Sequence, residues 1–159
     1  GRIKKDYLLL KTPILGKFLR LYYQIRFFDT LGNLTEAGVP LEKAFDIISE
    51  VVDNKIYQMQ IVATQAEVKK GNSISESLLK AQFLFEETAS EMLAVGEKTA
   101  NIAEMSQEVA QTQTHELSYR LQNLTTIIGP VVIVAVGVMV AIFALAILSP
   151  VFSLSQGVV

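Results

Sequence analysis

A long stretch without charge limits what this chain can fold into more than any other feature. All 14 basic and 16 acidic residues lie before residue 121. Within the charge-free part, residues 127–148 form an apolar run interrupted only by Gly129, Pro130 and Gly137. As a helix this run is roughly 33 Å long, which matches the roughly 30 Å hydrocarbon core of a bilayer. We therefore predict a transmembrane helix over residues 121–149; the alternative, a buried core helix, is rarely this long without a polar contact.

The charges beside this segment predict its orientation. Arg120 is the nearest basic residue and precedes the segment, whereas residues 150–159 carry no charge. Because loops rich in Lys and Arg stay preferentially on the cytoplasmic side, we expect residues 14–120 to form a cytoplasmic domain. Residues 150–159 are then a short extracytoplasmic tail.

The beginning of the chain is basic. Residues 1–26 contain seven Lys or Arg and one acid, Asp6, whereas residues 27–120 contain seven basic and fifteen acidic residues. Each basic residue near an anionic leaflet contributes about 1 kcal/mol, so we expect residues 1–13 to be a basic juxtamembrane lead. A solvated helix face explains the same charge equally well. Nucleic-acid binding is not expected, because no recognition motif accompanies the charge.

Residues 14–120 have the 3–4 spacing of helices and no alternating strand pattern. A first helix is expected after Pro13. It ends before Gly38, which suits the left-handed C′ position, and Pro40 opens a second helix. A third helix covers about residues 54–70 and ends at Gly71. Its predicted inward residues are Ile56, Met59, Ala63 and Ala66.

Three more helices complete the prediction. A fourth begins at Ser73, which has capping-box spacing to Glu76. A fifth covers about residues 86–95. A sixth begins near Asn101 and has no break before Gly129-Pro130, so we expect it to run directly into the membrane. The predicted fold is all-α, with a six-helix cytoplasmic bundle whose last helix continues into a single C-terminal transmembrane helix.

No constellation of residues indicates catalysis, cofactor binding or a metal site. His115 is the only histidine and is expected to be solvated on the sixth helix. There is no phosphate-binding loop of the GxxxxGK[ST] type, and no cysteine for thiolate chemistry. Glu97 is expected in a short loop between helices, where an acid caps the next helix, binds a partner or is simply exposed. We favour the structural role.

Six short motifs along the chain resemble one known family. They are Pro13-Ile-Leu-Gly16, Glu36-Ala-Gly38-Val-Pro40-Leu, Lys70-Gly71-Asn-Ser-Ile, Gly96-Glu97-Lys-Thr, Pro130-Val-Val-Ile and Ser149-Pro150-Val-Phe. In this order they resemble the type II secretion F domain of the PilC–GspF family. The chain departs from the family pattern at Ala100 and Gly129, where Gly and Glu are usual.

The resemblance implies a function. Members of the family carry two related cytoplasmic domains and three membrane helices, and this chain, which begins with Gly, resembles a fragment with the second domain and the last helix. It implies a non-enzymatic, homo-oligomeric platform in the bacterial inner membrane. The implied partners are a cytoplasmic assembly ATPase, pilin or pseudopilin subunits and other inner-membrane machine components. The alternative is a membrane-anchored signalling or receptor protein with a helical cytoplasmic domain.

Overall fold

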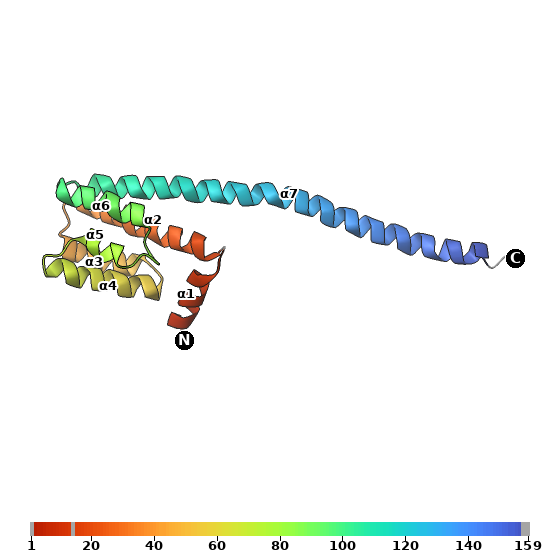
Figure 1. Ribbon diagram of the computed structural model, residues 1–159, viewed down its shortest axis with the longest axis horizontal. Coiled ribbons are helices and arrows are strands. Elements are labelled where there is room, and N and C mark those ends of the chain that lie inside the picture. Colours follow the sequence, from red (N-terminus) through yellow and green to blue (C-terminus); the bar gives the residue numbers. More distant parts are fainter. Residues whose placement is uncertain (1, 14, 157–159) are drawn as a thin grey trace. The chain divides into compact units, whose positions relative to one another are not determined.

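The protein is all-α. The computed structural model describes the backbone of residues 2–13 and 15–156 and the side chains of residues 3–13 and 15–148. This part of the chain contains seven helices and no strand: α1 (Arg2–Lys11), α2 (Leu15–Glu36), α3 (Leu41–Val51), α4 (Lys55–Lys69), α5 (Ile74–Leu79), α6 (Glu87–Lys98) and α7 (Ile102–Gln156) (Figure 1). They form two compact units, Gly1–Leu117 (unit 1) and Ser118–Val159 (unit 2). The predicted fold class is confirmed, with one more helix than expected.

Aromatic side chains form the centre of the unit 1 core. Phe27 lies edge-on to Phe28 from the same helix and to Phe85, with ring centroids 5.1 and 5.0 Å apart. All three rings are at most 1% exposed. Such edge-to-face pairs contribute about 0.5–1.5 kcal/mol beyond the area they bury. The segment before α6 is therefore tied to the middle of α2.

Tyr57 of α4 connects this core to two other elements. Its ring lies 5.5 Å from that of Phe85, and its hydroxyl donates to the backbone carbonyl of Leu84 at 2.6 Å. The carbonyl of Arg20 lies 3.2 Å from the same hydroxyl. Burial raises the pKa of Tyr57 far above its usual value, so the hydroxyl stays protonated and able to donate. One side chain thus joins α4, α2 and the segment before α6.

The predicted inward face of α4 is wrong. Met59 is 60% exposed, Ala63 and Ala66 are not among the fully buried residues of the core, and Ile56 is only partly buried. The buried residues of α4 are instead Tyr57, Ile61, Thr64 and Gln65. Polar groups on this face have partners: the Thr64 hydroxyl lies 2.8 Å from that of Ser77, and Gln65 Nε2 donates to the Glu42 carbonyl at 2.8 Å. Polar groups can be buried when they are hydrogen-bonded. The inner face of α4 therefore includes polar residues, and a prediction from apolar residues alone chose the wrong face.

Helix α1 occupies most of residues 1–13, the segment predicted to be a basic juxtamembrane lead. Leu10 is fully buried in the core of unit 1. The carboxylate of Asp6 accepts a hydrogen bond from the Lys55 backbone N–H at 3.1 Å, beside the Asn54 cap of α4. The lead is therefore an integral helix of the bundle. The 3–4 spacing that predicts a helix after Pro13 begins at Ile14, which lies outside the described residues.

Helices α2 and α7 pack against each other in opposite directions. Near one end of their contact, a Cβ on Gly32 would lie 2.8 Å from Gln107 Cγ and 3.1 Å from the Ala103 carbonyl oxygen. Further along, Gln113 Nε2 donates to Gln24 Oε1 at 2.8 Å. Residue numbers fall along α2 as they rise along α7. The start of α2 therefore lies at the end of unit 1 where α7 reaches residue 117.

The part of α7 in unit 2 continues without a break through Gly129-Pro130, as predicted. It also continues past Pro150 to Gln156, so the region expected to be a tail is helical over part of its length. Within the described residues, α7 is the one helix long and apolar enough to cross a membrane, and its apolar window is not buried against the chain. The limits 121–149 and 150–159 stay predictions.

The hydroxyl of Tyr57 generates a test of this packing. Tyr57→Phe leaves the buried Leu84 carbonyl without its donor, which we expect to reduce the free energy of unfolding by about 1–3 kcal/mol. Tyr22→Phe is the matched control, because Tyr22 is 44% exposed and the distance from its hydroxyl to Arg26 is 3.4 Å. Thermal melts of both variants in detergent, followed by circular dichroism, measure the difference. Equal melting temperatures would contradict the role given to Tyr57.

Candidate functional site

Three turns lie together at one end of unit 1: those between α2 and α3, α4 and α5, and α6 and α7 (Figure 1). We call this the turn end. Three of the sequence motifs fall on it, namely those that contain Gly38, Gly71 and Gly96. The α2 and α7 contact described above makes it the end opposite to the one where α7 reaches residue 117. Three motifs that are far apart in sequence are thus brought to one end of unit 1.

The first turn has the geometry predicted for it. Gly38 has φ +75°, its N–H donates to the Thr35 carbonyl at 3.0 Å, and the Val39 N–H donates to the Leu34 carbonyl at 2.9 Å. These two bonds define a Schellman motif with Gly38 at C′. Pro40 is the N-cap of α3. No atom lies within 4 Å of a Cβ built on Gly38, so backbone conformation alone requires glycine here.

The second turn repeats the motif. Gly71 has φ +90° and donates to the Val68 carbonyl at 3.0 Å, while the Asn72 N–H donates to the Glu67 carbonyl at 3.1 Å. Hydrogen bonds from the Lys70 ammonium and the Asn72 amide hold the pKa of Glu67 below its usual value. The Ser73 side chain then accepts from the Glu76 N–H, which confirms the predicted N-cap of α5.

The third turn contains Ala100, where the family pattern has glycine. Ala100 has φ +57° and is the only described residue other than glycine with positive φ. The Asn101 N–H donates to the Gly96 carbonyl at 2.7 Å, which is the outer bond of a Schellman motif with Ala100 at C′. A glycine at this position would avoid the steric cost that alanine meets. The turn keeps its geometry although the residue is unfavourable.

Gly96 and Glu97 both have structural contacts. A Cβ on Gly96 would lie 2.8 Å from Met105 Cβ, so α6 and α7 approach too closely for a side chain. Glu97 lies in the last turn of α6 rather than in a loop, and it caps α5 rather than the next helix. Its carboxylate accepts from the Ile74 N–H at 2.5 Å and from the Ser75 N–H at 3.0 Å. The structural role expected for Glu97 thus involves a helix earlier in the sequence.

A shallow hollow of about 360 Å³ lies at the turn end. It is lined from the first turn by Thr35, Gly38, Val39 and Leu41 and from the third by Ala100, Asn101, Ile102 and Ala103. Of these residues, Ile102 and Ala103 belong to α7. The glycines after α2 and α4 were the available signal for two of the turns, but nothing in the sequence indicated that the turns lie close together. The hollow carries no charged side chain among these lining residues and suits contact with a protein surface.

The remaining motif residues lie elsewhere. Pro13 and Gly16 are at the α1 and α2 junction, where a Cβ on Gly16 would collide with the Leu10 carbonyl oxygen. Pro130 lies in the unit 2 part of α7, and Pro150 lies in the same helix, in the part whose side chains are not described. These positions do not contribute to the turn end.

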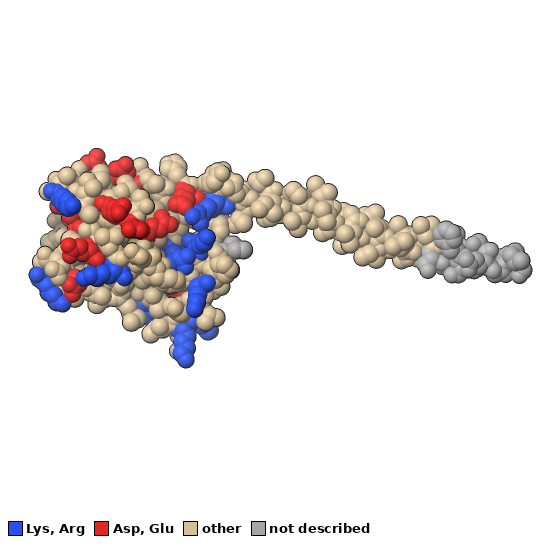
Figure 2. Space-filling model, viewed as in Figure 1, with Lys and Arg blue, Asp and Glu red and all other residues tan. Residues whose placement is uncertain are grey.

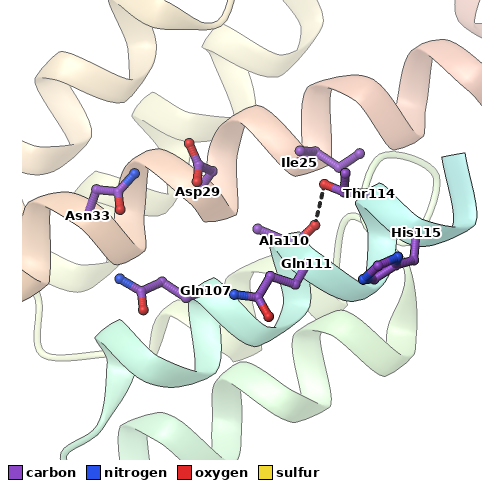
Figure 3. A pocket seen from close by; sticks show the side chains of 8 residues that line it. All are labelled: Ile25, Asp29, Asn33, Gln107, Ala110, Gln111, Thr114 and His115. Atoms are coloured by element: carbon purple, nitrogen blue, oxygen red, sulfur yellow. Dashed lines mark hydrogen bonds between the residues drawn. The ribbon is translucent and has the colours of Figure 1, made fainter. Parts of the chain in front are cut away.

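A second hollow, of about 280 Å³, lies between α2 and α7. Figure 3 shows Asp29 and Asn33 of α2 across from Gln107 and Gln111 of α7, with His115 further along α7. Its one drawn hydrogen bond is local, from the Thr114 hydroxyl to the Ala110 carbonyl at 2.7 Å. Within the described residues, no three His, Cys, Asp or Glu side chains are grouped as metal ligands. His115 is exposed, as expected.

The positive φ values at the turn end predict opposite effects for substitutions of Gly38 and of Ala100. Gly38→Val should reduce the free energy of unfolding by about 1–2 kcal/mol, because a branched side chain is unfavourable in the left-handed region. Gly38→Asn should be milder. Ala100→Gly should raise stability by up to about 1 kcal/mol despite the greater freedom of glycine in the unfolded chain. Thermal melts of the chain in detergent measure all three, and a lower melting temperature for Ala100→Gly would refute the assigned turn.

The carboxylate of Glu97 gives a second test. Glu97→Ala removes the acceptor for two backbone N–H groups, and we expect a loss of about 1–3 kcal/mol. Glu91→Ala is the control on the same helix, since Glu91 is exposed. Glu97→Gln should fall between them because it keeps an acceptor without the charge. Urea unfolding measures the differences; a Glu97→Ala variant as stable as Glu91→Ala would show that this cap contributes nothing.

Comparisons with known proteins agree with the motifs. Residues 27–150, more than half of the chain, match the family described as type II secretion system (T2SS), protein F. The chain is 32% identical over 148 residues to the type II secretion system protein F of Pseudomonas aeruginosa. The aligned region covers 93% of this chain and 36% of the relative.

Two type IV pilus proteins are also similar. The type IV pilus assembly protein PilC of Myxococcus xanthus is 28% identical over 99% of the chain, and that of Thermus thermophilus is 29% identical over 97%. The chain spans 38% of the length of each. The six motifs, the helical bundle with its apolar final helix and these similarities lead to one conclusion: the chain belongs to the type II secretion system protein F family, which includes the pilus assembly protein PilC.

Proposed function

We propose that the chain is part of a non-enzymatic inner-membrane platform of a type II secretion or type IV pilus assembly machine. The match of residues 27–150 to the family carries this proposal. The printed names of the relatives, type II secretion system protein F and type IV pilus assembly protein PilC, favour it over a signalling or receptor protein. In this proposal, the platform links a cytoplasmic assembly ATPase to the extraction and polymerisation of pilin or pseudopilin subunits.

Helix α7 supports such a link. It belongs to the core of unit 1 through Val109 and Ala110, which are at most 5% exposed, and its backbone continues as one helix into the apolar segment of unit 2. A partner that displaces unit 1 thereby acts on a helix whose other part contacts lipid and neighbouring membrane components. In this proposal the ATPase supplies the energy, and the chain supplies binding surfaces and a connection.

The turn end is the surface that we assign to a cytoplasmic partner. It lies opposite the end where α7 reaches residue 117, and it has an uncharged hollow between two turns. Val95, in the last turn of α6, adds an apolar side chain that is 53% exposed. Interfaces depend on a few such side chains that become fully buried on binding. In the proposed orientation, unit 1 is cytoplasmic and residues 150–159 are extracytoplasmic.

Val95 tests the assignment of the partner surface. Val95→Glu should weaken capture of the assembly ATPase encoded with this protein by roughly tenfold or more, because a charge would be buried at the contact. Val62→Glu is the matched control, since Val62 of α4 is 55% exposed and away from the turn end. Binding is measured with purified full-length chain in detergent, and pilus or secretion assembly is scored in cells. Equal losses in both variants, or none in either, would contradict the assignment.

The same position tests the orientation. The chain has no native cysteine, so Val95→Cys introduces a single thiol on unit 1. A membrane-impermeant maleimide should label it only after the inner membrane is opened. Labelling in intact spheroplasts would place unit 1 outside the cytoplasm and exclude an ATPase partner.

A further inference from the structure

Helix α1 has an outward face that combines apolar and basic side chains. Opposite the buried Leu10, this face consists of Lys4, Lys5, Leu8, Leu9 and Lys11; we call it the α1 outer face. Leu8 is 70% exposed and Leu9 48%, and the three lysines are exposed. The two adjacent leucines form an exposed apolar patch bordered by lysines, and such patches mark sites of contact with a protein or a membrane.

The positive charge of this face is not neutralised within unit 1. Asp6 is the one acid on α1, and its carboxylate is engaged with the Lys55 N–H at 3.1 Å on the opposite, inner side. Among the described residues, Lys70 is the one lysine in an ion pair, which it forms with Glu67. Lys11 lies over the Tyr7 ring at 5.9 Å. Figure 2 shows Lys and Arg gathered over α1, whereas Asp and Glu gather over α6 and the first part of α7.

The face is held in place by contacts on the inner side of α1. The Leu10 carbonyl accepts from the Arg20 guanidinium at 2.6 Å, and the same guanidinium lies 5.0 Å from the centre of the Phe83 ring. Tyr7 packs against Phe83 with ring centroids 6.0 Å apart. With Leu10 buried and the approach at Gly16 too close for a side chain, α1 cannot rotate to bury Leu8. Its exposure is a consequence of the packing.

The position of α1 in unit 1 indicates what covers this face. Helix α1 joins the start of α2, which lies at the end of unit 1 where α7 reaches residue 117. The charge-free apolar segment follows residue 120 in the sequence. The α1 outer face is therefore at the end of unit 1 that is covalently nearest to the apolar segment, and opposite the turn end.

We propose that the α1 outer face binds the surface of an anionic phospholipid bilayer. Leu8 and Leu9 enter the boundary between head groups and acyl chains, and Lys4, Lys5 and Lys11 contact the phosphates. Basic amphipathic helices bind in this way through buried apolar area together with attraction to anionic lipid. The long apolar stems of lysine allow their ammonium groups to reach the phosphates from a helix lying in the interface. This inference rests on the membrane insertion of the apolar segment proposed above.

The chain has no tryptophan, so Leu8→Trp introduces a single fluorescent probe into this face. The full chain is reconstituted into vesicles of phosphatidylcholine with phosphatidylglycerol, with or without lipids brominated near the head group. Emission of the introduced indole should shift to the blue and be quenched by the brominated lipid. Val95→Trp, at the turn end, is the matched control and should emit as in water without quenching. Flotation of the vesicles reports insertion of the apolar segment separately.

Charge is tested in the same chain. Added to Leu8→Trp, each of Lys4→Gln and Lys5→Gln should lower the ratio of bound to free α1 about fivefold, and salt should have the same direction of effect. In vesicles of phosphatidylcholine without phosphatidylglycerol, the brominated lipid should quench the emission of the Leu8→Trp probe less.

Two outcomes would overturn the proposal. Chain that floats with the vesicles but shows water-like, unquenched emission from the Leu8→Trp probe refutes it while leaving membrane insertion intact. Quenching that is insensitive to the lysines and to phosphatidylglycerol refutes it as well, because the contact would then not depend on anionic lipid.

Discussion

The close approach of other helices to α2 is the constraint on which the rest of unit 1 depends. At its start, Gly16 leaves no room for a side chain beside the Leu10 carbonyl, and near its end Gly32 leaves none beside α7. Between these glycines, Phe27 and Phe28 form the centre of the aromatic core. Because α1 and the first part of α7 approach α2 this closely, their directions within unit 1 follow from that of α2. The turn end and the α1 outer face lie at opposite ends of unit 1 for the same reason.

At the turn end, the same left-handed C′ conformation is adopted by two glycines and by one alanine. Gly38 and Gly71 adopt positive φ without strain, whereas Ala100 adopts it at a steric cost. The hydrogen bond from Asn101 to the Gly96 carbonyl and the tight contact of Gly96 with Met105 hold that third turn in shape. Local strain persists where the surrounding contacts determine the conformation. The backbone conformation of the turn end is thus fixed by its three turns. The residues that line its hollow include no charged group.

Local patterns were sufficient for much of this structure. The left-handed conformation of Gly38, the helix end at Gly71 and the cap at Ser73 depend on residues within one helical turn, so the sequence predicted them correctly. The face of α4 was different, because Tyr57, Thr64 and Gln65 are buried by partners on other helices. Glu97 likewise has its partners more than twenty residues earlier in the chain. Neither contact leaves a periodic trace in its own segment.

The sequence alone determined a helical bundle followed by an apolar helix. The 3–4 spacing of apolar residues predicts the bundle. The apolar segment must be a helix if it crosses a bilayer, because its backbone groups must then be paired within the segment. Charge counts could mark residues 1–13 as basic, but not as a helix of the bundle. Tertiary packing decided that: burial of Leu10 and the bond from Lys55 to Asp6 orient α1, and this orientation leaves Leu8 and the lysines on the outside. Which helix faces stay exposed depends on which faces are buried in the core. Contacts between residues far apart in the sequence determine which faces are buried.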